Sequence, residues 1–295
     1  MKRLLIIGYG DIAQRTVARL PPGVEMRPVS RKQGIDLDRA ETLGPLRGWA
    51  DAVLHCAPPP SEASTDPRAD PRTTNLLATL EAGGILPRRL VYISTSGVYG
   101  DCGGAWVDET RAPNPQTARA VRRVAAERQI LAWGEQHAIA VVILRAPGIY
   151  ANNRLPEARL LKGTPVLDDQ HDAYTNHIHA DDLAAIALRA LEPSASPGVY
   201  NASDDSEMKM GEYMDLVAER LGIPKPPRVS WTEAQRAIPA SSLSFMGESR
   251  RLLNRKLKLQ LGVRLCYPTV FEGIPDRRKA LGVVSGNAIT RENFA

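Results

Sequence analysis

The chain has 295 residues, of which 43% are apolar and 24% charged, and this composition is typical of a globular protein with one large or two interdependent domains. No apolar run reaches the roughly 20 residues of a membrane span, and no signal peptide is recognisable, so we expect a cytoplasmic protein without a membrane partner. The net charge of +5 comes from arginines scattered along the chain, with only 5% aromatic residues, which argues against a nucleic-acid partner.

The first 20 residues predict a strand, a tight turn and a helix. Four apolar residues, 4–7, are typical of a strand buried on both faces, and they run into Gly8-Tyr9-Gly10-Asp11-Ile12-Ala13. Gly8 can take the backbone angles of the turn, Gly10 leaves room for a pyrophosphate, and Ala13 lets the helix pack close to the strand. The amides of residues 11–13 would attract phosphates. The motif predicts a dinucleotide site, although a purely structural turn can have the same sequence.

The end of the second expected strand, residues 24–29, bears on which cofactor binds. NAD-binding folds usually place an acid there for the ribose 2′-hydroxyl. This chain has Ser30-Arg31-Lys32 instead, and a hydroxyl with two cations suits a 2′-phosphate, so NADP is favoured over NAD. The alternative is that these three residues face solvent and that Asp36 takes the role of the acid.

A third buried strand is expected at residues 52–57, ending at three prolines. Ligands of open α/β sheets bind at the carboxyl ends of the strands. Cys56, Ala57 and Pro58 are therefore expected to line the dinucleotide, and His55 to be a core residue. A helix is expected over residues 73–82.

The segment 90–101 carries the most specific pattern, because an apolar strand ends in Ser94-Thr95-Ser96 before Val98-Tyr99-Gly100. It resembles the extended and atypical branch of the short-chain dehydrogenase/reductase superfamily, whose members are similar to NAD(P)-dependent epimerases and dehydratases. Further agreement with that branch lies in residues 144–150, 177–184 and 199–203.

The resemblance implies an α/β fold, with a Rossmann-type doubly wound parallel sheet in residues 1–150 and 176–203. A smaller substrate lobe would comprise residues 151–175 and 204–295, with helices at 211–221 and 249–261. The resemblance also implies that Thr95 is the catalytic hydroxyl, that Pro147 and Gly148 contact the cofactor, and that homodimers can form.

The chain departs from the family at its acid/base pair. In the family a tyrosine is followed four residues later by a lysine, which lowers the tyrosine pKa and holds the ribose. Matching the Pro-rich loop 112–115 and the downstream Glu127 places Arg119 and Arg123 at these two positions. A guanidinium cannot shuttle a proton near pH 7, so the usual proton transfer is in doubt. Substitute acids to consider are Tyr99, Tyr150 and His177.

Two classes of function remain open. The favoured one is NADP-dependent oxidoreduction of a carbonyl or sugar-nucleotide-like small molecule, with Thr95 and Arg119 polarising the oxygen and Arg123 holding the ribose. The arginine clusters leave an anionic substrate open. The other class is a non-catalytic NADP-binding redox sensor, and an epimerase or dehydratase is a further alternative. No metal site is expected, although His171, His177 and His179 lie close together in the sequence.

Overall fold

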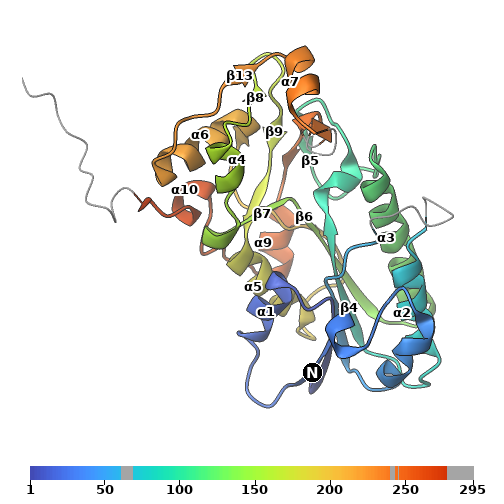
Figure 1. Cartoon of the computed structure of the whole chain (residues 1–295). Helices are drawn as coiled ribbons and strands as arrows, with labels where there is room; N and C mark the ends of the chain where they lie inside the picture. The colour runs from blue at the N-terminus through green and yellow to red at the C-terminus, as the bar shows by residue number, and fades with distance from the viewer. Residues whose placement is uncertain (61–68, 240–242, 245, 278–295) are drawn as a thin grey trace, which may run out of the picture.

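The computed structural model describes residues 1–60, 69–239, 243–244 and 246–277 (Figure 1). Its strands are β1 (Arg3–Ile7), β2 (Glu25–Val29), β3 (Ala52–His55), β4 (Arg89–Thr95), β5 (Trp106–Val107), β6 (Ala140–Ala146), β7 (Gly148–Tyr150), β8 (Val166–Leu167), β9 (Tyr174–Thr175), β10 (His177–His179), β11 (Gly198–Asn201), β12 (Met208–Lys209), β13 (Arg228–Val229) and β14 (Arg251–Leu252). Its α-helices are α1 (Asp11–Val17), α2 (Pro71–Glu81), α3 (Ala118–Gln136), α4 (Glu157–Leu161), α5 (Ala180–Leu191), α6 (Met210–Leu221), α7 (Trp231–Ala237), α9 (Arg255–Leu261) and α10 (Val270–Gly273). Short 3₁₀ helices are η1 (Arg31–Gln33), η2 (Ala40–Leu46), η3 (Ser96–Tyr99) and η4 (Asn152–Arg154).

Six parallel strands form the central sheet in the order β2-β1-β3-β4-β6-β11. The chain moves outward from β1 to β2 and then returns to β3 on the other side of β1, where Ile7 is in register with His55. The order of the strands therefore reverses between β1 and β3. Ligands of such sheets bind at this reversal, beyond the carboxyl ends of the strands.

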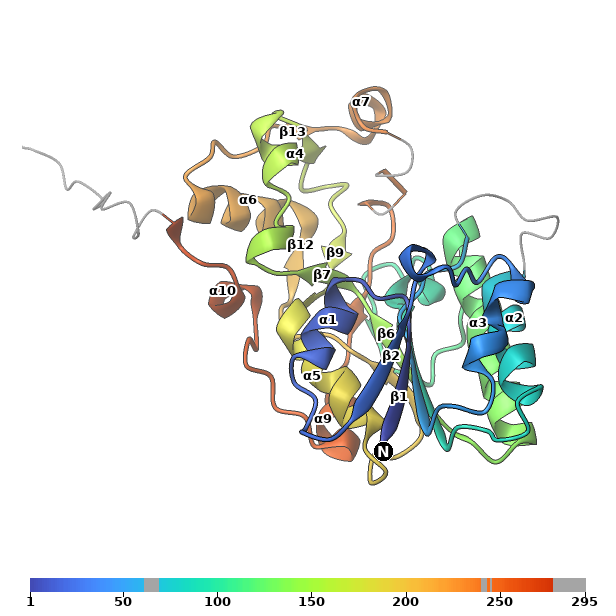
Figure 2. The same ribbon diagram turned by 60° about the horizontal axis from the view of Figure 1, so that its bottom comes forward.

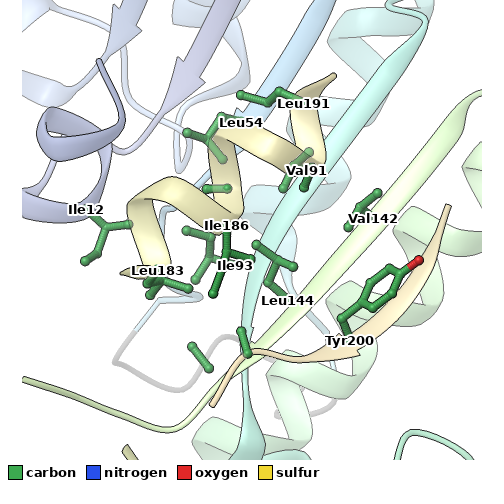
Figure 3. Close-up of a cluster of buried hydrophobic side chains, with 14 of the residues drawn as sticks. Ile12, Leu54, Val91, Ile93, Val142, Leu144, Leu183, Ile186, Leu191 and Tyr200 are labelled. Carbon is green, nitrogen blue, oxygen red and sulfur yellow. The ribbon is translucent and has the colours of Figure 1, made fainter. Parts of the chain in front are cut away.

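Helices cover both faces of the sheet, which confirms the doubly wound α/β prediction. Figure 2 shows α1, α5 and α9 on one side of the strands and α2 and α3 on the other. Because side chains alternate along a strand, Leu4 and Ile6 pack with the first layer, and Leu5 and Ile7 pack with the second. Figure 3 shows the first layer, where Ile186 of α5 lies among residues of β3, β4 and β6.

A second, smaller core lies beyond the carboxyl ends of the strands (Figure 1). It is built by helices α4, α6, α7 and α10 with the paired strands β8 and β13, and its largest buried residues include Tyr150, Tyr213 and Met214. We call this part the lobe. Its place above the sheet leaves one of the two hollows described below, which is lined from both sides.

The structure corrects one predicted helix. Residues 249–261 are not one helix, because strand β14 pairs with β5 before α9 begins at Arg255. Helix α9 then packs Leu257 and Leu261 against the sheet, so the chain after residue 203 does not stay in the lobe throughout. Within the described residues, no helix combines the length and apolarity needed to cross a bilayer.

Candidate functional site: two hollows at the carboxyl edge of the sheet

The glycine turn lies at the reversal between β1 and β3. Gly8 has φ +84°, and a Cβ there would lie 2.6 Å from the backbone nitrogen of Ala57, so the position requires glycine. Gly10 precedes α1, and a Cβ built on it would meet no atom within 4 Å, so the backbone is open on that side. Ala13 is fully buried against the sheet and Ile12 nearly so. The Asp11 carboxylate is held by two arginines, Arg15 at 2.9 Å and Arg154 at 3.2 Å.

The first hollow, which we call the nucleotide hollow, opens beside this turn. It is lined by Gly8, Val29, Ser30, Arg31, Ile35, Asp36, Leu37, Ala57, Pro58 and Arg72. The structure therefore brings together Ser30 and Arg31, predicted for the 2′-phosphate of NADP, and Asp36, the alternative acid for NAD. Lys32 is exposed on η1 and is not among the lining residues.

Polar groups of the nucleotide hollow already have partners inside the protein. The Ser30 hydroxyl donates to the Gln33 side chain at 3.1 Å, and the Asp36 carboxylate accepts the amide of Asp38 at 3.1 Å. No ion pair of Arg31 is found among the described residues. Arg31 is therefore the cation in this hollow that is left for a ligand anion.

Arg72 was missed by the sequence reasoning, which expected the helix to begin at residue 73. It follows the N-cap residue Asp70 at the start of α2, and its guanidinium donates to both carboxylate oxygens of Asp38, at 2.7 and 2.6 Å. It also donates to the carbonyl of Pro58 at 2.9 Å. The Arg72 hydrogen bond holds the pKa of Asp38 below its usual value despite partial burial. Only the fold brings α2 and the 31–38 segment together.

Cys56 and His55, at the end of β3, are core residues. Burial raises the pKa of the Cys56 thiol to about 12, and Cys56 is not among the residues that line the nucleotide hollow. Burial lowers the pKa of His55 to about 3, helped by the charges of Arg123 and Arg72. Neither side chain is suited to acid/base chemistry at neutral pH.

The second hollow, which we call the substrate hollow, has a volume of about 320 Å³ and lies between the sheet and the lobe. The sheet side contributes Thr95, Ser96, Gly97, Thr117, Arg119, Ala120, Pro147 and Gly148. The lobe side and its connections contribute Arg159, Ala173, Tyr174, Thr175, Asn176, Met210, Met246, Glu248 and Arg250. Thr95, Arg119, Pro147 and Gly148, all singled out from the sequence, therefore line one space.

Thr95 is held at the point where β4 ends. Its hydroxyl accepts the amide of Gly97 at 3.2 Å, which leaves the hydroxyl proton to donate. The preceding residue, Ser94, donates to the buried Glu127 of α3 at 2.5 Å. Glu127 also forms a buried ion pair with Arg145 of β6, at 2.7 Å. This network joins two strands and a helix directly beneath Thr95.

Arg119 and Arg123 lie on the first turns of α3 but have different surroundings. Arg119 lines the substrate hollow, where burial lowers its pKa while the charge of Glu248 opposes that shift. Arg123 donates to the Tyr92 hydroxyl at 2.9 Å and to the Ile93 carbonyl at 2.7 Å. Arg123 is therefore anchored on β4 and does not line the substrate hollow.

The three substitute acids considered from the sequence do not line the substrate hollow. Tyr99 donates its hydroxyl to Asn201 at 2.8 Å, and Tyr150 donates to the Thr269 carbonyl at 3.2 Å. His177 is stacked on a tyrosine of the lobe, and burial lowers its pKa to about 3. These residues are structural.

Tyr174, on β9, is the tyrosine that the sequence reasoning missed. It lines the substrate hollow, and the guanidinium carbon of Arg251 lies 4.6 Å from its ring centroid. Among the described residues its hydroxyl has no hydrogen-bond partner. No spacing in the sequence points to it, because the lobe brings it to Thr95 from 79 positions along the chain.

The histidines considered for a metal have separate partners. His171 pairs with Asp168 at 2.6 Å on the surface, and His179 accepts the amide of Asp181 at 3.2 Å at the start of α5. In the ranges that the structure describes, no three His, Cys, Asp or Glu residues are grouped as metal ligands.

Comparison with known proteins identifies relatives over most of the chain. The model of the NAD dependent epimerase/dehydratase family matches residues 33–203. A 3-diazoavenalumate denitrifying reductase of Streptomyces is 26% identical over 75% of both chains. A GDP-6-deoxy-D-mannose reductase of Pseudomonas aeruginosa is 30% identical over 62% of this chain and 68% of its own.

Solved structures agree on the fold. A functionally unknown conserved protein from Silicibacter pomeroyi is 29% identical and superposes with a TM-score of 0.76 over 96% of this chain and 99% of its own. RMD from Pseudomonas aeruginosa, complexed with NADPH, is 21% identical with a TM-score of 0.70 over 94% and 97% of the two chains. UDP-glucose 4-epimerase of Thermus thermophilus, complexed with NAD, is 24% identical with a TM-score of 0.71 over 96% and 100%.

Proposed function

The chain belongs to the NAD dependent epimerase/dehydratase family, and we propose that it is an NADP-dependent oxidoreductase that reduces or forms a carbonyl group. The observation that carries the proposal is the substrate hollow, which brings Thr95 and Arg119 together with the lobe. Both hollows open at the carboxyl edge of one sheet, where a dinucleotide can reach from one to the other.

We propose NADP as the cofactor on the charges of the nucleotide hollow. Arg31 forms no salt bridge among the described residues, although its charge acts on the Asp38 carboxylate, and Ser30 adds a hydroxyl beside it. Arg72 is already neutralised by Asp38, so Arg31 would meet the 2′-phosphate. Asp36 lines the same hollow, but its carboxylate already accepts the amide of Asp38 at 3.1 Å. RMD from Pseudomonas aeruginosa is complexed with NADPH and the Thermus epimerase with NAD, so these neighbours support a nicotinamide cofactor of either kind.

The residues of the substrate hollow suit the reduction of a carbonyl. When bound, the cofactor supplies a hydride to the carbonyl carbon, and the electron pair of the C=O bond passes to the oxygen. The hydroxyl of Thr95 donates a hydrogen bond to that oxygen, and the guanidinium of Arg119 stabilises its developing negative charge. Arg119 keeps its proton throughout.

The proton that completes the alcohol requires a different donor. We assign it to Tyr174, which is the phenol lining the substrate hollow. Glu248 also lines it, but its side chain already accepts a hydrogen bond from Arg250 at 2.9 Å. A tyrosine hydroxyl can give its proton to the alkoxide and recover it from solvent. In the reverse direction the Tyr174 phenolate would accept the proton of the alcohol.

A redox sensor is the second candidate. It is favoured by Arg119 and Arg123, which occupy the expected positions of the family's proton-transferring pair. A sensor must bind NADPH and NADP with different affinities, because a ligand with equal affinity for both states shifts no equilibrium.

The test is a titration with NADPH, NADP, NADH and NAD, followed by nicotinamide fluorescence, with oxidation recorded against a set of carbonyl compounds. Tight binding of NADP(H) with turnover supports the oxidoreductase. Tight binding that separates NADPH from NADP without turnover supports the sensor. Preference for NAD(H) would overturn the role of Arg31 and assign the ribose to Asp36.

A further inference from the structure

Arg159 enters the lobe side of the substrate hollow from helix α4. Its Nη2 donates to the carbonyl of Pro165 at 3.2 Å and lies 3.5 Å from the Sδ of Met246. Its Nε is buried and has no acceptor among the described residues. The remaining nitrogen, Nη1, has no hydrogen-bond partner among the described residues. One edge of the guanidinium is therefore fixed by the lobe, and Nη1 is left for a ligand.

The charge of Arg159 is not balanced by a neighbour. Burial lowers the pKa of this guanidinium, and no carboxylate among the described residues acts against the shift. The substrate hollow contains three arginines, Arg119, Arg159 and Arg250, but one glutamate, and that glutamate is paired with Arg250 at 2.9 Å. The hollow thus has an excess of positive charge.

A partly buried guanidinium without a counterion is costly, and proteins usually pair such a group. The buried Arg145 shows the ordinary solution in this same fold, because Glu127 pairs with it at 2.7 Å. At Arg159 no carboxylate among the described residues plays this part. A bound anion in the hollow would supply the countercharge through a charge-assisted hydrogen bond from Nη1.

We infer that Arg159 is the anchor for an oxyanion group of the substrate, a carboxylate or a phosphate. The inference rests on the proposed function in that the reacting carbonyl of the same molecule lies at Thr95. Met210 and Met246 line the hollow as well and offer apolar contact to the part of the substrate between its two ends. Arg159 is in this view a specificity residue and takes no part in proton or hydride transfer.

The direct test reads Arg159 itself. Protein carrying ¹⁵N-arginine is titrated with inorganic phosphate and, separately, with acetate, and the Nε–H resonances are followed by NMR with and without NADPH. The Arg159 resonance is identified by its loss in Arg159→Gln. We expect this resonance to shift and saturate with one of the two anions, which also tells phosphate from carboxylate. A resonance that moves with neither anion in folded protein overturns the inference.

This readout is independent of the proposed function. If NADPH does not bind, the oxidoreductase proposal fails while the shift of the Arg159 resonance is still measurable. Phosphate bound at the glycine turn would move other resonances, because the Arg159 side chain belongs to the other hollow.

Turnover provides the second test, with 4-carboxybenzaldehyde and its methyl ester as paired substrates. Arg159→Gln should lower kcat/KM for the acid by about 30-fold or more and change that for the ester by less than about 3-fold. The matched control is Arg236→Gln, which removes an exposed arginine of the same lobe that does not line the hollow, and it should change neither substrate. An equal fall for acid and ester in Arg159→Gln would show a structural role and refute anion recognition.

Discussion

The two hollows differ in how the chain builds them. The nucleotide hollow is made mostly by the ends of β1, β2 and β3 and the short segments that follow them, with Arg72 of α2 added from farther along the chain. The substrate hollow is made by side chains from the sheet and the lobe, such as Thr95 and Tyr174. The comparison teaches that the first hollow depends on local backbone geometry, and the second on long-range packing that places side chains.

The largest expected effect concerns the support under the substrate hollow. Glu127→Gln leaves Arg145 buried without a countercharge. We therefore expect the free energy of unfolding, measured in urea, to decrease by about 3–5 kcal/mol. The control is Glu192→Gln, an exposed glutamate that pairs with Arg189, and the loss of unfolding free energy should stay below about 1 kcal/mol. Equal losses for the two variants would mean that the buried network does not support the strand ends.

The glycine turn offers a pair of substitutions that separate backbone strain from ligand contact. Gly8→Ala forces a side chain onto positive φ and into Ala57, so it should destabilise the protein by about 2–4 kcal/mol. Gly10→Ala adds a methyl group in open space, so it should leave the melting temperature nearly unchanged but weaken NADPH binding. If Gly10→Ala binds NADPH with unchanged affinity, the pyrophosphate does not bind at this turn.

Tyr174→Phe tests the assignment of the proton donor in the substrate hollow. Loss of a general acid costs about 100-fold or more in rate, so kcat should fall by that factor while NADPH affinity is retained. Tyr200→Phe is the control, since its hydroxyl bonds to the Ser196 carbonyl at 2.8 Å on β11 and does not line the hollow. If Tyr174→Phe keeps its rate, the proton comes from elsewhere.

Acid should destabilise the folded protein through two buried histidines, His55 on β3 and His177 on β10. The folded pKa of His55 and of His177 is about 3, below the ordinary 6.5, so the folded state binds fewer protons than the unfolded state. Stability from each is complete above about pH 6.5 and falls as the pH decreases. The free energy of unfolding, measured in urea, should fall between pH 7.5 and pH 5. In His55→Asn and in His177→Asn this fall should be smaller than in the unmodified protein by up to about 2 kcal/mol. Identical losses in all three proteins would contradict this account.

The smallest expected effect concerns the cofactor. Arg31→Ala should weaken NADPH binding about 10-fold and leave NADH binding nearly unchanged, because only NADPH carries the 2′-phosphate. Lys32→Ala is the matched control, as Lys32 lies outside the lining of the nucleotide hollow. A larger effect at Lys32 than at Arg31 would reverse their assigned roles.

The sequence by itself determined the sheet, its first turn and its family, because these depend on neighbours in the chain. An apolar run followed by Gly8 and Gly10 defines a strand and turn through local backbone sterics, and the Ser94-Thr95-Ser96 run marks the end of β4 in the same way. Thr95, Arg119, Pro147 and Gly148 were singled out through the family resemblance that these motifs carry, and all line the substrate hollow.

Only the tertiary structure decided which side chains face the hollows. Arg119 and Arg123 are equivalent on a helical repeat, yet Arg119 lines the substrate hollow and Arg123 is anchored on β4. Tyr174 and Arg159 come from the lobe, and no spacing relates them to the sheet. The physical reason is that turns are governed by backbone geometry within a few residues, whereas a cavity is defined by packing between segments far apart in the chain.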